Sequence, residues 1–129
     1  MNLQFDYDRR YWPPAPVVEI AIDGYSPNVQ PIVIRALVDS GADGTMIPLS
    51  VLERVKADYT DSVRMRGVTG SSEQKDRYRV RIQIGDIVVR GIDAVAIDSE
   101  DESLIGRDTL SQLVVILDGL AAETRIADQ

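Results

Sequence analysis

The amino-acid sequence predicts a single all-β domain of short strands with one or two short helices. Two observations favour this fold class: apolar residues alternate with polar residues over much of the chain, and glycine-containing turns separate the alternating segments. A third is the length of 129 residues, which suits one domain and lets a chain bury roughly two-thirds of its unfolded surface. Helical character is confined to residues 49–56 and 108–113.

Residues 1–16 differ from the rest, and we expect an extended N-terminal arm followed by one domain over residues 17–129. Proline fixes its own φ and biases its predecessor towards extended backbone, which argues against a helix here. We expect the aromatic side chains to pack on the body of the protein or on a second subunit. In particular, we interpret Trp12 as a packing anchor rather than a platform for a ligand. The segment holds four aromatic residues and three prolines: Phe5, Tyr7, Tyr11, Trp12, Pro13, Pro14 and Pro16.

Strands are expected at residues 18–22, 32–38, 78–84, 87–89, 94–97 and 114–117. The run 32–38 is nearly continuous and β-branched, so we expect it to be buried. Asp108 is the expected N-cap of the second helix. Three arginines alternate with apolar residues near position 80, and we favour a solvated face for them over docking on an acidic partner or on the acidic surface of this protein. They are Arg77, Arg79 and Arg81.

Composition excludes several classes of function. The formal charge of −7 argues against sequence-independent nucleic-acid binding, which needs an excess of cations. The chain has no cysteine, which excludes disulfides, thiol nucleophiles and cysteine-ligated zinc. It also has no histidine, which excludes Ser-His-Asp catalysis and histidine-ligated metals. Catalysis would have to use carboxylates, lysine, tyrosine, hydroxyls or an oxygen-ligated metal.

The sequence contains no recognisable targeting or membrane segment. The first ten residues carry acids and lack an apolar stretch of signal-peptide length. The longest apolar runs are far shorter than the ~20 residues that span a bilayer. We therefore expect a soluble cytoplasmic protein without a membrane partner.

The most informative segment is 36–45, where an apolar run leads into Asp39-Ser40-Gly41. The pattern delivers a carboxylate from the end of a strand into a tight loop, and glycine there lets other backbone approach closely. One interpretation is an ordinary turn, because aspartate, serine and glycine are common turn residues.

A second interpretation of this segment is a calcium loop. Asp39, Asp43 and Gly44 match positions one, five and six of an EF-hand. Gly41 and Ser50, however, stand where the third ligand and the bidentate glutamate belong. An expected strand rather than a helix precedes the loop, which also disfavours calcium.

The third interpretation draws on a second motif, Leu104-Ile105-Gly106-Arg107-Asp108, far downstream. Together the two motifs resemble the retropepsin-like (retroviral-type) aspartic proteases and their bacterial and cellular relatives. In that family an apolar-apolar-Asp-Ser/Thr-Gly-Ala loop is supported by an apolar-apolar-Gly-Arg segment, with a glycine-rich flap hairpin between them. Residues 63–72 are the flap candidate. The resemblance implies a retropepsin-like barrel with one lobe per chain.

The resemblance also implies roles for individual residues. Asp39 would be the catalytic carboxylate, while Ser40, Gly41 and Gly106 would support the active-site loop. Arg107 would form a structural ion pair with Asp43. The implied substrate-binding residues are Ala42, Asp43, Gly67, Val68, Thr69 and Gly70. No cofactor or metal is implied. Ser40 replaces the commoner threonine, and Gly44 stands where several viral members have a second acid.

Peptide hydrolysis by carboxylates alone needs one acid to deprotonate water and another to protonate the carbonyl oxygen. Two carboxyls about 3 Å apart cannot both ionise, so they share a proton. The chain has one Asp-Ser-Gly, so the second acid must come from another copy in a symmetric homodimer. We therefore predict a homodimeric aspartic endopeptidase acting on peptide or protein substrates. The alternative is a catalytically silent dimerisation or peptide-binding module with the same fold.

Overall fold

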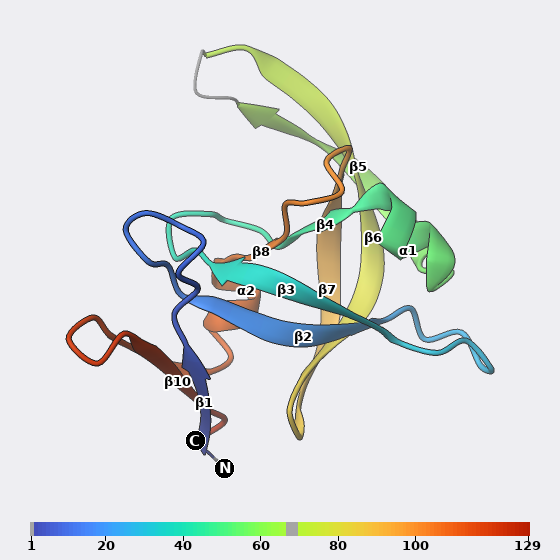
Figure 1. Cartoon of the computed structure of the whole chain (residues 1–129). Coiled ribbons are helices and arrows are strands. Elements are labelled where there is room, and N and C mark those ends of the chain that lie inside the picture. The colour runs from blue at the N-terminus through green and yellow to red at the C-terminus, as the bar shows by residue number, and fades with distance from the viewer. Residues whose placement is uncertain (1, 67–69) are drawn as a thin grey trace.

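Figure 1 shows the computed structural model of the chain, in which residues 2–66 and 70–129 are described. Ten strands and two helices make up this part of the chain, and the longest elements are the strands β6 and β7. In chain order the elements are β1 (Asn2–Asp6), β2 (Val17–Asp23), β3 (Ile32–Val38), β4 (Met46–Pro48), α1 (Leu49–Arg54), β5 (Asp58–Arg66), β6 (Ser72–Ile84), β7 (Ile87–Ile97), β8 (Leu104–Ile105), α2 (Arg107–Leu110), β9 (Val114–Asp118) and β10 (Glu123–Ala127).

Seven strands form the main sheet, in the order β2-β3-β8-β4-β7-β6-β5. Most pairs are antiparallel, but β8 runs parallel to β3 and β4 runs parallel to β7. β2 also pairs with β6, so the sheet curls back on itself. Closing a sheet in this way lets its inward-facing side chains form one core. The all-β prediction is therefore confirmed, with two short helices as expected.

The core lies inside this curled sheet and is almost entirely aliphatic. Alternating residues of β2 and β6 point inward, as the two-residue period of a strand requires. The helix α1 covers one end of the core with Val51 and Leu52. The largest fully buried apolar side chains are Ile20, Ile22, Ile47, Leu52, Ile82, Ile84, Ile105 and Ile126.

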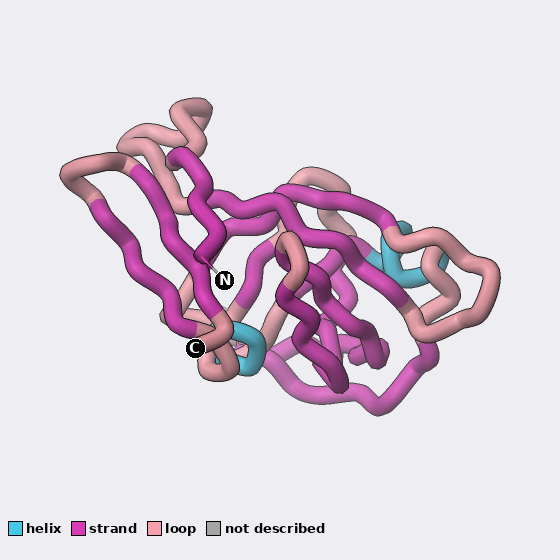
Figure 2. The backbone as a smooth tube through the Cα atoms, turned by 90° about the horizontal axis from the view of Figure 1, so that it is seen from below, coloured by secondary structure: helices cyan, strands magenta, loops and turns pink. Residues whose placement is uncertain are grey.

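A second sheet of three strands, in the order β1-β10-β9, joins the two ends of the described chain. Figure 2 shows these strands side by side at one edge of the molecule. Leu3 and Phe5 of β1 pack against the core. Leu3 lies so close to Gly85 that a Cβ atom at Gly85 would be 2.6 Å from Leu3 Cδ2. The first residues of the arm are thus part of a sheet that is anchored on the body.

The structure corrects several details of the sequence prediction. Strand β3 alternates in burial, and Val33 is 60% exposed, because only one face of the strand meets the core. Residues 87–97 form one continuous strand rather than two, since β6 pairs along its length. The strands β1, β4, β5, β8 and β10 were not predicted, because they are short or strongly polar.

The three alternating arginines of β6 stay partly exposed, but they also pair with acids of this chain, the alternative that the sequence analysis disfavoured. Each of the three alternating arginines of β6 bonds an aspartate from a different neighbouring strand. Arg77 donates two hydrogen bonds to Asp61 of β5, at 2.7 and 2.6 Å. Arg79 Nε donates to Asp93 of β7 at 2.6 Å, and Arg81 Nε donates to Asp23 of β2 at 2.9 Å. The first pair joins the two strands of the β5–β6 hairpin, and the other two bind its base to β7 and β2.

Helix α2 begins one residue earlier than predicted. Its N-cap is Gly106 rather than Asp108, and the carboxylate of Asp108 turns instead towards Thr45. Trp12 does not pack on the body either, because its side chain is 93% exposed. Among the described residues, neither helix approaches the length and apolar character of a bilayer-crossing helix.

Candidate active site

Asp39 follows directly on β3 and begins the loop that carries the Asp-Ser-Gly motif. The last residues of β3 pair with β8, and the Asp39 N–H donates to the carbonyl of Ile105 at 3.1 Å. The Ala42 N–H donates back to the Asp39 carbonyl at 3.2 Å and closes a tight turn. The Asp39 carboxylate is thus held on a strand that is fixed from both sides.

The Asp39 side chain is itself oriented by the glycine of the motif. The Gly41 N–H donates to Asp39 Oδ1 at 2.9 Å. A Cβ atom on Gly41 would lie 3.2 Å from the same oxygen, so a side chain there would press on the carboxylate. Asp39 is half-buried, whereas Ser40 and Gly41 are exposed. The carboxylate therefore has a fixed direction and remains accessible.

Arg107, the first residue of α2, fastens the outer part of the loop. Its Nη1 donates to the Ser40 carbonyl at 2.8 Å, and its Nη2 pairs with the Asp43 carboxylate. The Arg107 backbone N–H donates to the Ala42 carbonyl at 2.9 Å. One arginine therefore contacts three positions of the loop, Ser40, Ala42 and Asp43. Both members of this ion pair are at least half exposed, so its contribution is geometric more than energetic.

Gly106 lies directly under the loop. A Cβ atom at this position would be 2.6 Å from the Gly44 carbonyl oxygen and 2.8 Å from that of Ala42. Backbone atoms of a braced loop cannot retreat as a flexible side chain could. Position 106 therefore has to be glycine for the second motif to pack beneath the first.

A buried polar cluster holds the far end of the loop. Asp108 accepts hydrogen bonds from the Thr45 N–H at 3.1 Å and from the Thr45 hydroxyl at 2.7 Å. The Thr45 hydroxyl also lies 2.8 Å from that of Thr109, and both threonines are fully buried. Gly106 N–H donates to the Thr45 hydroxyl oxygen at 3.3 Å. The sequence analysis missed this cluster, because Thr45 and Thr109 are 64 positions apart and no sequence pattern links them.

A hollow of about 380 Å³ lies beside the loop, between the β5–β6 hairpin and the strands β4 and β7. It begins next to Gly44, where an added Cβ atom would be 3.8 Å from Val95 Cγ2. Four of its lining residues are apolar and four are polar or charged, and the hollow was not predicted from the sequence. The residues that line it are Met46, Met65, Arg66, Ser71, Glu73, Lys75, Val95 and Ile97.

The β5–β6 hairpin is the element that the sequence analysis assigned to a flap. Arg66 pairs with Ser72 at the last described rung before its tip. Gly70 has a φ of +86°, which a residue with a side chain rarely adopts. The predicted substrate contacts Gly67, Val68 and Thr69 lie outside the described residues.

The two acids that a calcium loop would need are engaged elsewhere. The Asp43 carboxylate pairs with Arg107, and the Asp39 carboxylate accepts the Gly41 N–H. Within residues 2–66 and 70–129, no three acidic side chains converge as the ligands of a metal ion would. The arrangement instead presents one accessible carboxylate on a rigid loop beside a hollow.

Comparisons with known proteins agree with this arrangement. The sequence model of the family described as "Aspartyl protease" matches residues 18–109, which include both motifs. No curated protein matches the chain in a sequence search. The match to the family model covers well over half of the chain and extends from β2 to the first turn of α2.

Solved structures also resemble this fold, among them two proteases. A retropepsin-like aspartic protease from Rickettsia conorii superimposes with a TM-score of 0.67 at 15% identity, covering 98% of this chain and 89% of its own. The EIAV protease complexed with the inhibitor HBY-793 gives a TM-score of 0.58 at 21% identity, covering 75% and 86%. These likenesses confirm the resemblance seen in the two motifs. The chain belongs to the aspartyl protease family and has the retropepsin-like fold.

Proposed function

We propose that the protein is a homodimeric aspartic endopeptidase in which Asp39 of each subunit forms the catalytic pair. The observation that best supports this proposal is the bracing of the Asp39 loop by the first turn of α2. Between them, Gly106, Arg107 and Asp108 contact the loop at several points from Ser40 to Thr45. Such bracing is what a reaction needs when its catalytic groups must stay within a fraction of an ångström.

The chemistry follows from a pair of carboxyls that share one proton. The ionised carboxyl removes a proton from water as the water oxygen attacks the carbonyl carbon of the peptide, and the protonated carboxyl gives its proton to the carbonyl oxygen. The tetrahedral intermediate then collapses, the C–N bond breaks, and a proton passes to the leaving nitrogen. Water is consumed, and the products are one acid and one amine.

A second copy supplies the second acid. The chain holds a single Asp-Ser-Gly within 129 residues, too few for two lobes of the kind that would carry one motif each. A twofold axis beside Asp39 places the residue next to its symmetry mate without any further feature. Ser40 is exposed next to Asp39, where its hydroxyl would meet the loop of the other subunit.

The substrate would run between the loop and the β5–β6 hairpin. Ala42 and Asp43 would contact the peptide backbone from one side, and residues 67–70 of the hairpin from the other. The hollow beside Gly44 would receive one substrate side chain, and its four apolar lining residues favour an apolar one.

The test is incubation of the purified chain with a denatured protein at several pH values, with and without a statine-type inhibitor. Inhibitor-sensitive cleavage is expected from the wild type. Asp39→Asn is expected to abolish cleavage and to leave dimerisation, measured by sedimentation, intact. Asp86→Asn, at an exposed turn, removes the same charge and is the matched control.

The outcomes separate the competing interpretations. Undiminished turnover by Asp39→Asn would exclude Asp39 from the mechanism. A wild type that dimerises and binds peptide without cleaving it would be the silent module instead.

A further inference from the structure

The N-terminal arm presents an exposed aromatic tip. The side chain of Trp12 is 93% exposed and that of its neighbour Tyr11 is 45% exposed. Among the described residues, six of the ten large apolar side chains that face solvent lie on this arm or on β9 and the turn after it. Apolar groups that cluster on one side of a protein commonly mark an interaction surface.

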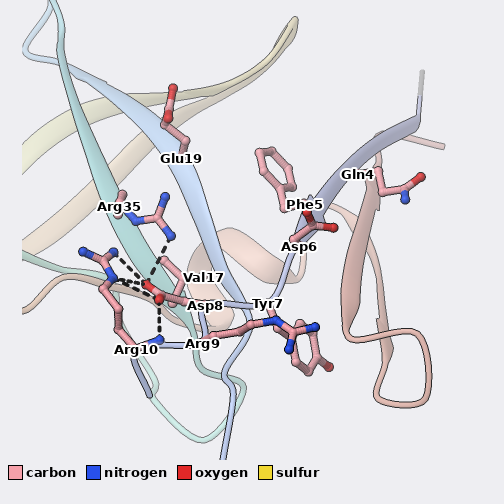
Figure 3. Close-up of a pocket in the computed structure, with 10 residues that line it drawn as sticks. All are labelled: Gln4, Phe5, Asp6, Tyr7, Asp8, Arg9, Arg10, Val17, Glu19 and Arg35. Atoms are coloured by element: carbon pink, nitrogen blue, oxygen red, sulfur yellow. Dashed lines mark hydrogen bonds and ion pairs between the residues drawn. The ribbon is translucent and has the colours of Figure 1, made fainter. Parts of the chain in front are cut away.

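The tip is held in place by a charged clamp at its base. The Asp8 side chain is only 5% accessible and accepts hydrogen bonds from the Arg10 backbone N–H at 2.9 Å and from Arg35 Nη2 at 3.1 Å. Arg10 also grips the same carboxylate with Nε and Nη2, at 3.0 and 2.8 Å. Figure 3 shows both arginines converging on Asp8. The hydrogen bonds from Arg10 hold the pKa of Asp8 well below its usual range, so the clamp stays charged in acid.

The clamp makes the tip a preorganised element. Asp8 also pairs with Ala15 in an antiparallel bridge, so residues 9–14 form a closed loop, here called the arm loop. Its geometry is fixed before any partner arrives, which lowers the entropy lost on binding. Trp12 is the only tryptophan of the chain and its largest apolar side chain, yet it remains exposed to solvent in the single subunit.

The arm loop stands beside Asp39. The Val38 N–H donates to the Pro16 carbonyl at 2.8 Å, so the loop leaves the body one residue away from the candidate catalytic position. The Tyr7 N–H donates to the Ala122 carbonyl at 2.8 Å, which places the turn after β9 alongside. Figure 1 shows the arm loop, that turn and the end of β3 on the same side of the molecule, at the left.

We propose that the arm loop docks on a second copy of this chain and that Trp12 is its anchor. The inference rests on the proposed function, because a twofold axis next to Asp39 brings the partner to the side on which the loop stands. Charge favours the same occupant. Each copy carries a net charge of −7, whereas the arm loop exposes the cation of Arg9 beside Arg10, whose charge the Asp8 carboxylate of the clamp offsets. A contact through this loop therefore brings positive charge towards an acidic partner and offsets the repulsion between copies.

Trp12 supplies its own probe, because it is the only tryptophan of the chain. The fluorescence emission of Trp12 is excited selectively and recorded at increasing protein concentration. The fraction of dimer is measured in parallel by sedimentation. The expected result is a shift of emission to shorter wavelength with the same midpoint as dimerisation. Burial of an exposed indole in an apolar contact produces such a shift, and a tryptophan outside the interface would not respond.

Substitutions give the second readout. Trp12→Ala is expected to raise the dimer dissociation constant about 30-fold, the effect of removing a strong interface anchor. Trp12→Phe should recover part of this loss because a ring remains. Val33→Ala, which trims a side chain that is 60% exposed on β3, is the matched control and should leave the constant unchanged. At concentrations that saturate dimerisation, Trp12→Ala should cleave substrate at the wild-type rate.

The possible failures are distinguishable. If the wild type dimerises and cleaves while Trp12 emission stays that of a solvated indole, the docking proposal is wrong and the proposed function stands. If the emission shifts only when a peptide substrate or inhibitor is added, Trp12 contacts the substrate and the proposal is again overturned. If the wild type neither dimerises nor cleaves at any concentration tested, both proposals fall together.

Discussion

The carboxylate of Asp108 accepts a hydrogen bond from the backbone N–H of Thr45 and another from its hydroxyl, although the two residues are 63 positions apart. Sequence patterns assign Asp108 to the cap of its own helix. In the folded chain it is used instead to hold the end of the Asp39 loop. The helix α2 is therefore a support for the loop more than an independent element.

Asp108→Ala should destabilise the fold by about 1–3 kcal/mol, because the buried N–H of Thr45 loses its acceptor. Cleavage should fall by more than the loss of folded protein accounts for, since the loop end is released. Urea denaturation and kcat/KM measure the two effects. Asp108→Asn keeps one acceptor oxygen and should lie between the wild type and the alanine variant. Equal stability of the wild type and the alanine variant would show that the cluster is not needed.

Gly106→Ala should cost about 3 kcal/mol or prevent folding, since the added methyl group overlaps backbone atoms of Gly44 and Ala42. Gly119→Ala is the control, because no heavy atom lies within 4 Å of a Cβ atom built there. Thermal unfolding of the two variants provides the comparison. A Gly106→Ala protein with the melting temperature of the control would contradict the close packing.

Arg107→Lys should change stability by less than about 1 kcal/mol, because the pair with Asp43 is solvent-exposed. It should nevertheless reduce kcat/KM, since lysine cannot contact the Ser40 carbonyl and Asp43 with one rigid group. Arg90→Lys, at an exposed position of β7, is the control. Unchanged peptide turnover by Arg107→Lys would show that the paired contacts of the guanidinium group with Ser40 and Asp43 are not needed to hold the loop.

The stability of the β5–β6 hairpin should persist into acid. Hydrogen bonds from Arg77 lower the pKa of Asp61, and those from Arg79 lower the pKa of Asp93. Because the folded-state pKa values lie below the unfolded ones, the stabilisation is complete well above about pH 3.9 and is lost as the pH falls through the folded-state pKa values.

Asp61→Asn tests this dependence. The variant should melt at a lower temperature than the wild type at pH 5–7, and the difference should shrink below about pH 4. Asp58→Asn, an exposed residue of the same strand, should show no such convergence. If the difference in melting temperature between the wild type and Asp61→Asn grew as the pH fell, the predicted dependence of stability on pH would have the wrong sign.

Much of the fold was predictable because local patterns and tertiary packing agree. In β2 and β6, apolar residues that face the core alternate with polar residues that face solvent, so both strands could be predicted from the sequence. This pattern fails for β4 and β8, which have three and two residues, too few to show a period. It also fails for β5, whose sequence is largely polar because the hairpin stands away from the core.

The site was predictable where a motif constrains the backbone and unpredictable where the contacts are made by side chains distant in sequence. The structure places Asp39 in a tight loop and Gly106 beneath that loop, which is the local arrangement that the resemblance of the two motifs implied, while the catalytic role of Asp39 stays a proposal. The arginine pairs of β6 were not predicted, because their partners, Asp61, Asp93 and Asp23, lie on three separate strands. The hydrogen bond between the buried hydroxyls of Thr45 and Thr109 was hidden for the same reason.

The pairing of β1 with β10 has a consequence for how such an enzyme would be controlled. The strands β1 and β10 at the two ends of the described chain already pair with each other within one subunit. Separating two copies would therefore break no strand pairing inside either copy. Dilution should therefore yield intact single subunits that recombine quickly. Protein concentration alone would then switch proteolysis on and off without refolding.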